Sequence, residues 1–335
     1  MKKLILHIGY PKTATTTLQH NLFKSLHDEG EIEWLHGNTF FNDNTLLNFS
    51  CENVLKALTG QKVETFTKDD VERELAEMAK ITKDVSVISD EDLVFKFPGF
   101  SWANGQDALG NAEKLKRIFT PYFDKIEILI GLRAQETIIQ SYFVQCHTLI
   151  KNEKQNYEDI GIFLEENVLK PESPLFFNYN NLIDEYERVF EKKNVHLLIF
   201  EDLLMDKVHF YSILSELFLL EKDRVRILFE KSVKNTTSKS REGYLAKENT
   251  WFYRKLIKPI RSKLRSSLNG DWYKKIHNLY KLVTPQSLRQ KSIRVRSLTD
   301  QEKYEIRNKY NAGNRQLIAN YGLSESKLRS YGYLE

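Results

Sequence analysis

Short strand-like runs that alternate with amphipathic stretches constrain the fold of this 335-residue chain more than any other feature. The runs span residues 4–8, 84–89, 125–132 and 195–200. The amphipathic stretches between them span residues 14–27, 69–83, 107–119 and 179–190. Continuous apolar strands that alternate with helices are typical of a parallel sheet covered on both faces. The sequence therefore predicts a three-layer α/β fold with a central parallel sheet flanked by helices.

The first strand leads into a turn that carries one lysine and a cluster of threonines. This turn reads Pro11-Lys12-Thr13-Ala14-Thr15-Thr16-Thr17. A helix N-terminus presents unpaired N–H groups and the positive end of its dipole, so an anion docked there gains several hydrogen bonds. Lys12 adds a positive charge, and the hydroxyls add donors. A nucleotide-triphosphate loop would need glycine directly before the lysine, where this chain has Pro11; threonines at a helix start can also be caps without a ligand.

A second candidate motif follows the strand at 125–132. Arg133 stands at the end of that strand, and Ser141 lies eight positions later. A helix that begins near Ala134 would carry Ser141 about two turns along its axis. The planar guanidinium of an arginine can donate two parallel hydrogen bonds to a phosphate. This spacing alone occurs by chance in many chains, so its place directly after a strand is what singles it out.

Both motifs resemble those of sulfotransferases that use 3′-phosphoadenosine 5′-phosphosulfate. Residues 11–18 resemble the 5′-phosphosulfate loop P-K-x-G-T-T-x-L, with Ala14 in the place of the glycine. A Cβ at that position disfavours a left-handed backbone. The resemblance, strongest to bacterial carbohydrate and glycolipid sulfotransferases, implies a P-loop-like fold, this nucleotide as donor, adenosine 3′,5′-bisphosphate as product, and no metal.

The resemblance also assigns roles to individual residues. It implies that the donor is bound by Lys12, Thr13, Ala14, Thr15, Thr16, Thr17, Arg133 and Ser141, the last two at the 3′-phosphate. The segment 238–243 is similar to an R-K-G loop that closes over the 3′-phosphate, with Arg241 and Gly243 as the matching residues.

Catalysis of sulfuryl transfer requires charge neutralisation and a base. Lys12 is expected to stabilise the charge that develops on the bridging oxygen. The base should follow the strand at 84–89, because in such a sheet this strand ends beside the first. Ser89-Asp90-Glu91 is similar to an S-x-E of bacterial sulfotransferases, which makes Glu91 the expected base. Asp90, His7 and His36 are the alternatives, and the segment can also be an ordinary charged loop.

The charge of the chain is unevenly distributed. Residues 231–296 contain 18 lysines and arginines and only three acidic residues, so the rest of the chain is net negative. Within this region, residues 251–265 interleave aromatic and cationic side chains, as suits an anionic membrane surface or a polysaccharide. No nucleic-acid-binding motif accompanies the charge, and a solvated helical face is the plain alternative. We expect a single domain over 1–335 with 231–296 as a basic helical subdomain or extension.

The remaining features narrow the class of protein. No stretch approaches about 18 consecutive apolar residues, the two cysteines and eight histidines show no metal-binding spacing, and Met1-Lys2-Lys3 leads directly into a strand. We therefore expect a cytoplasmic enzyme, in part at the inner face of the membrane, that sulfates a hydroxyl of a carbohydrate, polysaccharide or glycolipid. A kinase-like phosphate-loop enzyme and a non-enzymatic basic membrane- or polysaccharide-binding protein are the alternatives.

Overall fold

The computed structural model describes most of the chain and divides it into two compact units. It describes residues 1–37, 54, 68–93, 111–153, 159–170, 177–231, 239–240, 243–249 and 290–335. The first unit comprises Met1–Ile139, Asn167–Thr236 and Asp300–Glu335, and the second comprises Gln140–Glu166 and Thr237–Thr299. Most of the basic region 231–296 thus belongs to the second unit. This unit also contains Gln140–Glu166, which the sequence analysis did not separate from the rest of the chain.

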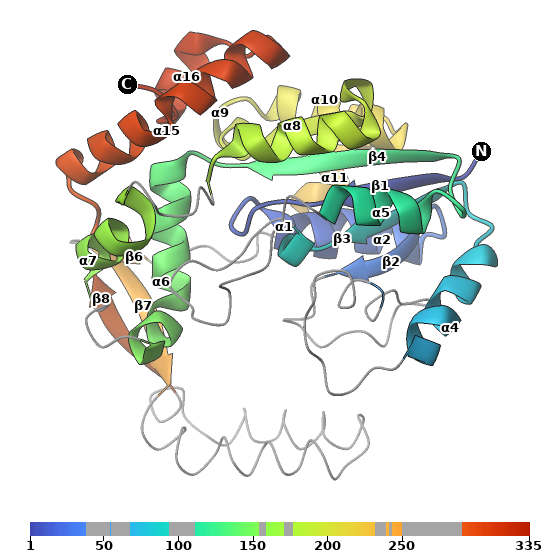
Figure 1. Cartoon of the computed structure of the whole chain (residues 1–335), viewed down its shortest axis with the longest axis horizontal. Coiled ribbons are helices and arrows are strands. Elements are labelled where there is room, and N and C mark those ends of the chain that lie inside the picture. The colour runs from blue at the N-terminus through green and yellow to red at the C-terminus, as the bar shows by residue number, and fades with distance from the viewer. Residues whose placement is uncertain are drawn as a thin grey trace. The chain divides into compact units, whose positions relative to one another are not determined.

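A five-stranded parallel sheet forms the centre of the first unit (Figure 1). Its strands, in spatial order, are β2 (Glu33–Gly37), β3 (Val85–Ser89), β1 (Lys3–His7), β4 (Lys125–Leu132) and β5 (Val195–Ile199). In the central register Leu6 lies beside Ile88 on one side and Ile128 on the other. The predicted α/β fold with a parallel sheet is confirmed, and β2 is an edge strand that the sequence analysis missed.

Helices cover both faces of this sheet. One face carries η1 (Leu18–Phe23), α2 (Lys24–Asp28), α10 (Lys207–Phe218) and α11 (Lys222–Glu230). Ile5, Val87 and Leu129 form a buried cluster with side chains of these helices, among them Leu22 and Phe210. The other face carries α8 (Tyr179–Phe190), which contacts β4 and packs against α5 (Asn111–Phe119) and α15 (Asp300–Tyr321). The predicted three layers are therefore present.

The helix that follows the first strand is less regular than the sequence suggests. It begins as α1 (Thr15–Thr17), passes through the π-helical turn η1, and continues as α2. Gly30, with φ of 75°, follows the end of the helix, where glycine adopts the left-handed conformation without steric cost. π-helical turns are frequent at functional sites.

The remaining described elements of the first unit are helices, and two further helices reach the boundary between the units. Those within the first unit are α4 (Lys68–Ala79), η4 (Glu91–Leu93), η8 (Lys192–Asn194), α9 (Asp202–Met205) and α16 (Glu325–Tyr331). Helix α6 (Gln135–Glu153) begins in the first unit and continues into the second, and η7 (Glu165–Leu169) also crosses the boundary. None of the helices in the described ranges is long and apolar enough to cross a membrane.

The second unit contains a small antiparallel sheet of β6 (Lys239–Ser240), β7 (Gly243–Asn249) and β8 (Gln290–Val295), together with α7 (Ile160–Leu164). All three strands fall inside the basic region 231–296, and its assignment as a helical subdomain or extension stays a prediction. Strands β7 and β8 pair with Ala246 opposite Ile293; in β8, Lys291, Ser292 and Arg294 are exposed, whereas Val295 is buried. The aromatic and basic segment 251–265 lies outside the described residues.

Candidate functional site

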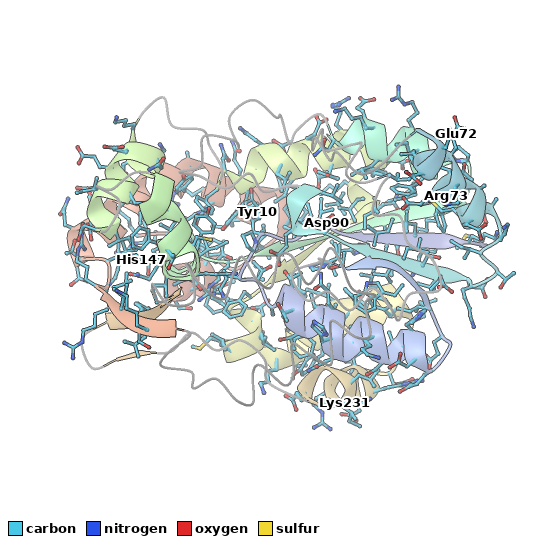
Figure 2. All side chains as sticks on the ribbon, turned by 90° about the horizontal axis from the view of Figure 1, so that it is seen from below. Tyr10, Glu72, Arg73, Asp90, His147 and Lys231 are labelled. Atoms are coloured by element: carbon cyan, nitrogen blue, oxygen red, sulfur yellow. The ribbon has the colours of Figure 1, made fainter. Side chains whose placement is uncertain are left out.

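The carboxyl ends of three adjacent strands meet at one edge of the sheet. The backbone N–H of Asp90, just after β3, donates to the carbonyl oxygen of His7 at 3.0 Å, and that of Tyr10 donates to Gly131 of β4 at 3.2 Å. Figure 2 shows Tyr10 and Asp90 at the same end of the sheet. Ligands of open parallel sheets bind outside the carboxyl ends of the strands, so this edge is the first place to look for a site.

The loop after β1 has an unusual backbone. Lys12 and Ala14 both adopt positive φ, at 72° and 68°. Left-handed backbone costs an L-residue with a Cβ roughly 1–2 kcal/mol, and such conformations cluster at ligand-binding sites. Ala14 therefore keeps the conformation that a glycine would adopt, although its Cβ disfavours it. Its carbonyl oxygen accepts hydrogen bonds from Thr17 and Leu18 at 2.9 and 3.0 Å and so starts the helix.

The buried side chain of Thr13 stabilises this loop through a hydrogen bond to its backbone. Its side chain is 1% exposed, and its hydroxyl donates to the carbonyl oxygen of Tyr10 at 2.6 Å. Glycines leave the room for it: a Cβ on Gly131 would lie 2.6 Å from Thr13 Oγ1, and one on Gly9 would lie 3.1 Å from it. Thr13 thus holds the loop against the sheet with its side chain.

The other threonines of the loop divide into two groups. Thr15 is buried, and its Oγ1 lies 3.5 Å from that of Thr13. Thr16 and Thr17, like Lys12, are only half-buried. The side chains that solvent or a ligand can reach are therefore those of Lys12, Thr16 and Thr17.

Arg133 joins this loop from the end of β4. Its Nη1 donates to the carbonyl oxygen of Lys12 at 2.9 Å, and its Nε donates to Thr137 Oγ1 at 3.0 Å. The guanidinium also lies 4.3 Å above the ring of Phe200. Two motifs that are 121 positions apart in the sequence thus meet in space.

Aromatic packing connects the same two segments. The ring of Tyr10 packs edge-on against Tyr179 with centroids 4.8 Å apart. The hydroxyl of Tyr179 in turn donates to the carbonyl oxygen of Arg133. Both tyrosines are buried, so the loop and the strand end are held by a common core.

Two other residues, Ser141 and Arg241, are expected at the 3′-phosphate by resemblance. Ser141 lies on α6 in the second unit, where it is buried and its Oγ has no hydrogen-bond partner among the described residues. Its pairing with Arg133 stays a prediction. Arg241 lies outside the described residues, whereas Gly243 begins β7 with φ of 142°.

The expected base lies in η4, directly after β3. Glu91 is half-buried there, and its neighbour Asp90 is buried. His7 is completely buried, and burial lowers its pKa to about 3. Its Nδ1 shares a hydrogen bond of 2.7 Å with Ser89 Oγ, which also accepts from Gln19 Nε2 at 3.0 Å. His7 is thus a neutral structural residue of the sheet edge, and the side chain of His36 lies outside the described part of the chain.

One buried carboxylate of this edge escaped the sequence analysis. Glu201 follows β5, and its Oε1 accepts a hydrogen bond of 3.0 Å from the backbone N–H of Ala134. Burial raises the pKa of Glu201 to about 7, although that hydrogen bond and the charge of Arg133 oppose the rise. The signal in the sequence is Phe200-Glu201-Asp202-Leu203, which resembles the Y-E-D-L that closes this strand in many bacterial sulfotransferases.

Within the described ranges, no group of three or more histidine, cysteine, aspartate or glutamate side chains could hold a metal ion. Beside the carboxylates already described, the edge gathers the cations of Lys12 and Arg133 and the hydroxyls and backbone turn of residues 12–17, which suit an anionic ligand.

Of three comparisons with known proteins, the one with solved structures found similar proteins. No family model matches the chain, and no curated protein matches it. Two sulfotransferase structures are similar to parts of it. One, from Alicyclobacillus acidocaldarius, is 15% identical with a TM-score of 0.37, and the match covers 67% of this chain and 83% of that chain. The other, mouse sulfotransferase SULT7A1 complexed with PAP, is 12% identical with a TM-score of 0.37, and the match covers 69% of this chain and 65% of that chain.

Proposed function

We propose that this chain binds 3′-phosphoadenosine 5′-phosphosulfate and transfers its sulfuryl group to a hydroxyl of a carbohydrate, polysaccharide or glycolipid. The observation that carries the proposal is the hydrogen bond from Arg133 Nη1 to the carbonyl oxygen of Lys12. It joins the loop that resembles a phosphosulfate-binding loop to the arginine that resembles a 3′-phosphate ligand. A donor with one phosphate group at each end of its ribose requires two anion-binding motifs close together.

The proposed chemistry is an in-line displacement at sulfur. A bond forms between the acceptor oxygen and sulfur while the bond from sulfur to the oxygen of the 5′-phosphate breaks. Lys12 neutralises the charge that develops on that leaving oxygen, and Glu91 accepts the proton of the acceptor hydroxyl. The backbone of residues 12–17 and the hydroxyls of Thr16 and Thr17 bind the 5′ end.

The donor's 3′-phosphate is assigned to Arg133, with Ser141 and Arg241 as further ligands by resemblance. Arginine suits this role because its planar fork can bind a phosphate through two hydrogen bonds. Sulfotransferases often carry a further basic residue within this spacing, and this chain has Thr137, Ile138 and Ile139 in that region. The hydroxyl of Thr137 accepts a hydrogen bond from Arg133 and so orients the guanidinium.

A ligand screen tests the proposal against its alternatives. Adenosine 3′,5′-bisphosphate at a hundredfold excess over its Kd should stabilise the fold by about 2.7 kcal/mol without divalent metal, and Arg133→Ala should reduce the stabilisation at the same ligand concentration. Stabilisation by ATP with magnesium instead would favour a kinase-like enzyme. Stabilisation by neither nucleotide would favour a non-enzymatic protein.

The basic region provides the second part of the proposal, that the enzyme works near an anionic membrane or a polyanionic acceptor on the cytoplasmic side. The cations of 251–265 attract such surfaces at roughly 1 kcal/mol each. Co-sedimentation with anionic vesicles at low salt, reversed at high salt, is the expected result. No sedimentation at low salt would leave the region a solvated face.

A further inference from the structure

The three residues that follow Arg133 are each bound by a side chain from elsewhere in the first unit. The backbone N–H of Ala134 donates to Glu201. The side-chain amide of Gln135 exchanges two hydrogen bonds with that of Asn314, at 2.9 and 3.0 Å. The carboxylate of Glu136 pairs with Arg307 at 3.2 Å. The start of α6, which carries Arg133 directly before it, is therefore held by side chains at the end of β5 and on α15.

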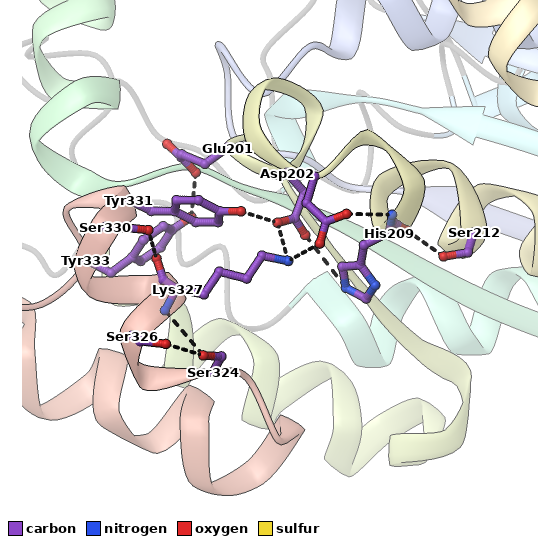
Figure 3. A network of polar contacts seen from close by, with 11 residues as sticks. Glu201, Asp202, His209, Ser212, Ser324, Ser326, Lys327, Ser330, Tyr331 and Tyr333 are labelled. Carbon is purple, nitrogen blue, oxygen red and sulfur yellow. Dashed lines mark hydrogen bonds and ion pairs between the residues drawn. The ribbon is translucent and has the colours of Figure 1, made fainter.

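A single residue, Tyr333, connects two of these contacts. Its hydroxyl donates to Glu201 Oε2 at 3.2 Å, and its carbonyl oxygen accepts from Asn314 Nδ2 at 2.8 Å. Figure 3 shows Tyr333 and Glu201 joined in this way. The side chain of Tyr333 is completely buried, and that of Asn314 is 2% exposed. Buried polar groups are costly to leave unpaired, so these contacts fix one another's geometry.

Tyr333 is itself held in a fixed place. It follows α16, whose Lys327 lies 2.7 Å from Asp202 and 3.0 Å from Asp206. The hydroxyl of Tyr331 donates to Asp202 at 2.8 Å (Figure 3). Helix α16 is thus fastened to α9, the short helix that begins one residue after Glu201.

We propose that Tyr333, acting through Glu201 and Asn314, is a positioning residue for Arg133. The path is short: Tyr333 holds the carboxylate of Glu201, Glu201 holds the N–H of Ala134, and Ala134 is the neighbour of Arg133. Phe200, over whose ring the guanidinium lies, is the neighbour of Glu201. A small displacement of a binding group sharply weakens its interaction with the ligand. This inference rests on the proposed function, since the ligand of Arg133 is taken to be the donor's 3′-phosphate.

Tyr333→Phe tests the inference because it removes only the hydroxyl. The measurement is the ratio of the Kd values of adenosine 5′-monophosphate and adenosine 3′,5′-bisphosphate, which reports on the 3′-phosphate alone. We expect this ratio to fall about tenfold, the equivalent of about 1.4 kcal/mol. Tyr211→Phe removes the hydroxyl of another buried tyrosine, which donates to Glu230 at 2.9 Å, without touching the contacts of Ala134 or Tyr333, and it should leave the ratio unchanged.

A second readout does not depend on any ligand. Hydrogen exchange at the start of α6 should become faster in Tyr333→Phe and not in Tyr211→Phe. Should Tyr333→Phe fail to fold, Glu201→Met removes both acceptors and should give the same two results. Glu201→Gln keeps an acceptor for the N–H of Ala134, so the ratio of the two Kd values should stay at its wild-type value.

The possible failures are distinguishable. A wild-type protein that binds both nucleotides equally would overturn the proposed function and this inference with it. A wild-type protein that prefers the bisphosphate, with a Tyr333→Phe variant that keeps both the preference and the slow exchange, would overturn this inference alone.

Discussion

Replacing Glu201 with glutamine should change how the stability of the protein depends on pH. Burial raises the pKa of this carboxyl from 4.5 to about 7. The folded state therefore binds the proton more tightly than the unfolded state does. The stabilisation of the folded state by this tighter proton binding is fully present below about pH 4.5 and is lost as the pH rises through 7. A shift of this size corresponds to about 3 kcal/mol, at 1.36 kcal/mol for each pH unit.

The assay is urea unfolding of the wild-type protein and of Glu201→Gln between pH 4 and 8. Because other groups titrate in both proteins, the informative quantity is the difference in their free energies of unfolding. Relative to the variant, the wild-type protein should lose about 3 kcal/mol from low to high pH. Glu216→Gln, at an exposed position, controls for the loss of one negative charge. A difference that stays flat, or that favours the wild-type protein as the pH rises, would refute the burial argument.

Three further substitutions test the loop. Ala14→Gly relieves roughly 1–2 kcal/mol of left-handed strain but adds about 0.5–1 kcal/mol of unfolded-state entropy, so urea unfolding should show a change between about zero and about 1.5 kcal/mol in favour of the variant; a loss of about 1 kcal/mol would contradict the left-handed backbone of Ala14. Gly131→Ala places a Cβ 2.6 Å from Thr13 Oγ1, which should cost about 1–3 kcal/mol of stability and weaken binding of adenosine 3′,5′-bisphosphate; unchanged binding would separate Thr13 from the site. Lys12→Ala should lower the rate of transfer to an acceptor, found by screening carbohydrates and glycolipids, far more than it weakens binding of the desulfated product; equal effects on both would remove its role at the leaving oxygen.

The parts of the fold that the sequence predicts are those with a local signal. Continuous apolar runs identify β1, β3, β4 and β5, and the helical spacing identifies α8 at residues 179–190. The edge strand β2 was missed because Glu33-Trp34-Leu35-His36-Gly37 is short and has only two large apolar residues. Strand β8 was missed because Lys291 falls on the same face as Ile293 and Val295 and so interrupts the period of two.

The candidate site divides in the same way. Lys12 and Arg133 could be singled out because each lies directly after a strand within a recognisable motif. The hydrogen bond between them and the support of Thr13 by Gly131 depend on how β1 and β4 pair, which local patterns do not give. Glu201 and Tyr333 are 132 positions apart in the sequence, and nothing in the spacing of either indicates their contact.

The most direct test of the proposed donor site is a calorimetric titration of the protein with adenosine 3′,5′-bisphosphate and with adenosine 5′-monophosphate, in the presence of a metal chelator. We predict one bisphosphate bound per chain, with an affinity at least about tenfold higher than that of the monophosphate, as one charge-assisted contact to the 3′-phosphate would give. Arg133→Ala should bring the two affinities together. Equal affinities in the wild-type protein, or no binding of the bisphosphate at all, would contradict the account.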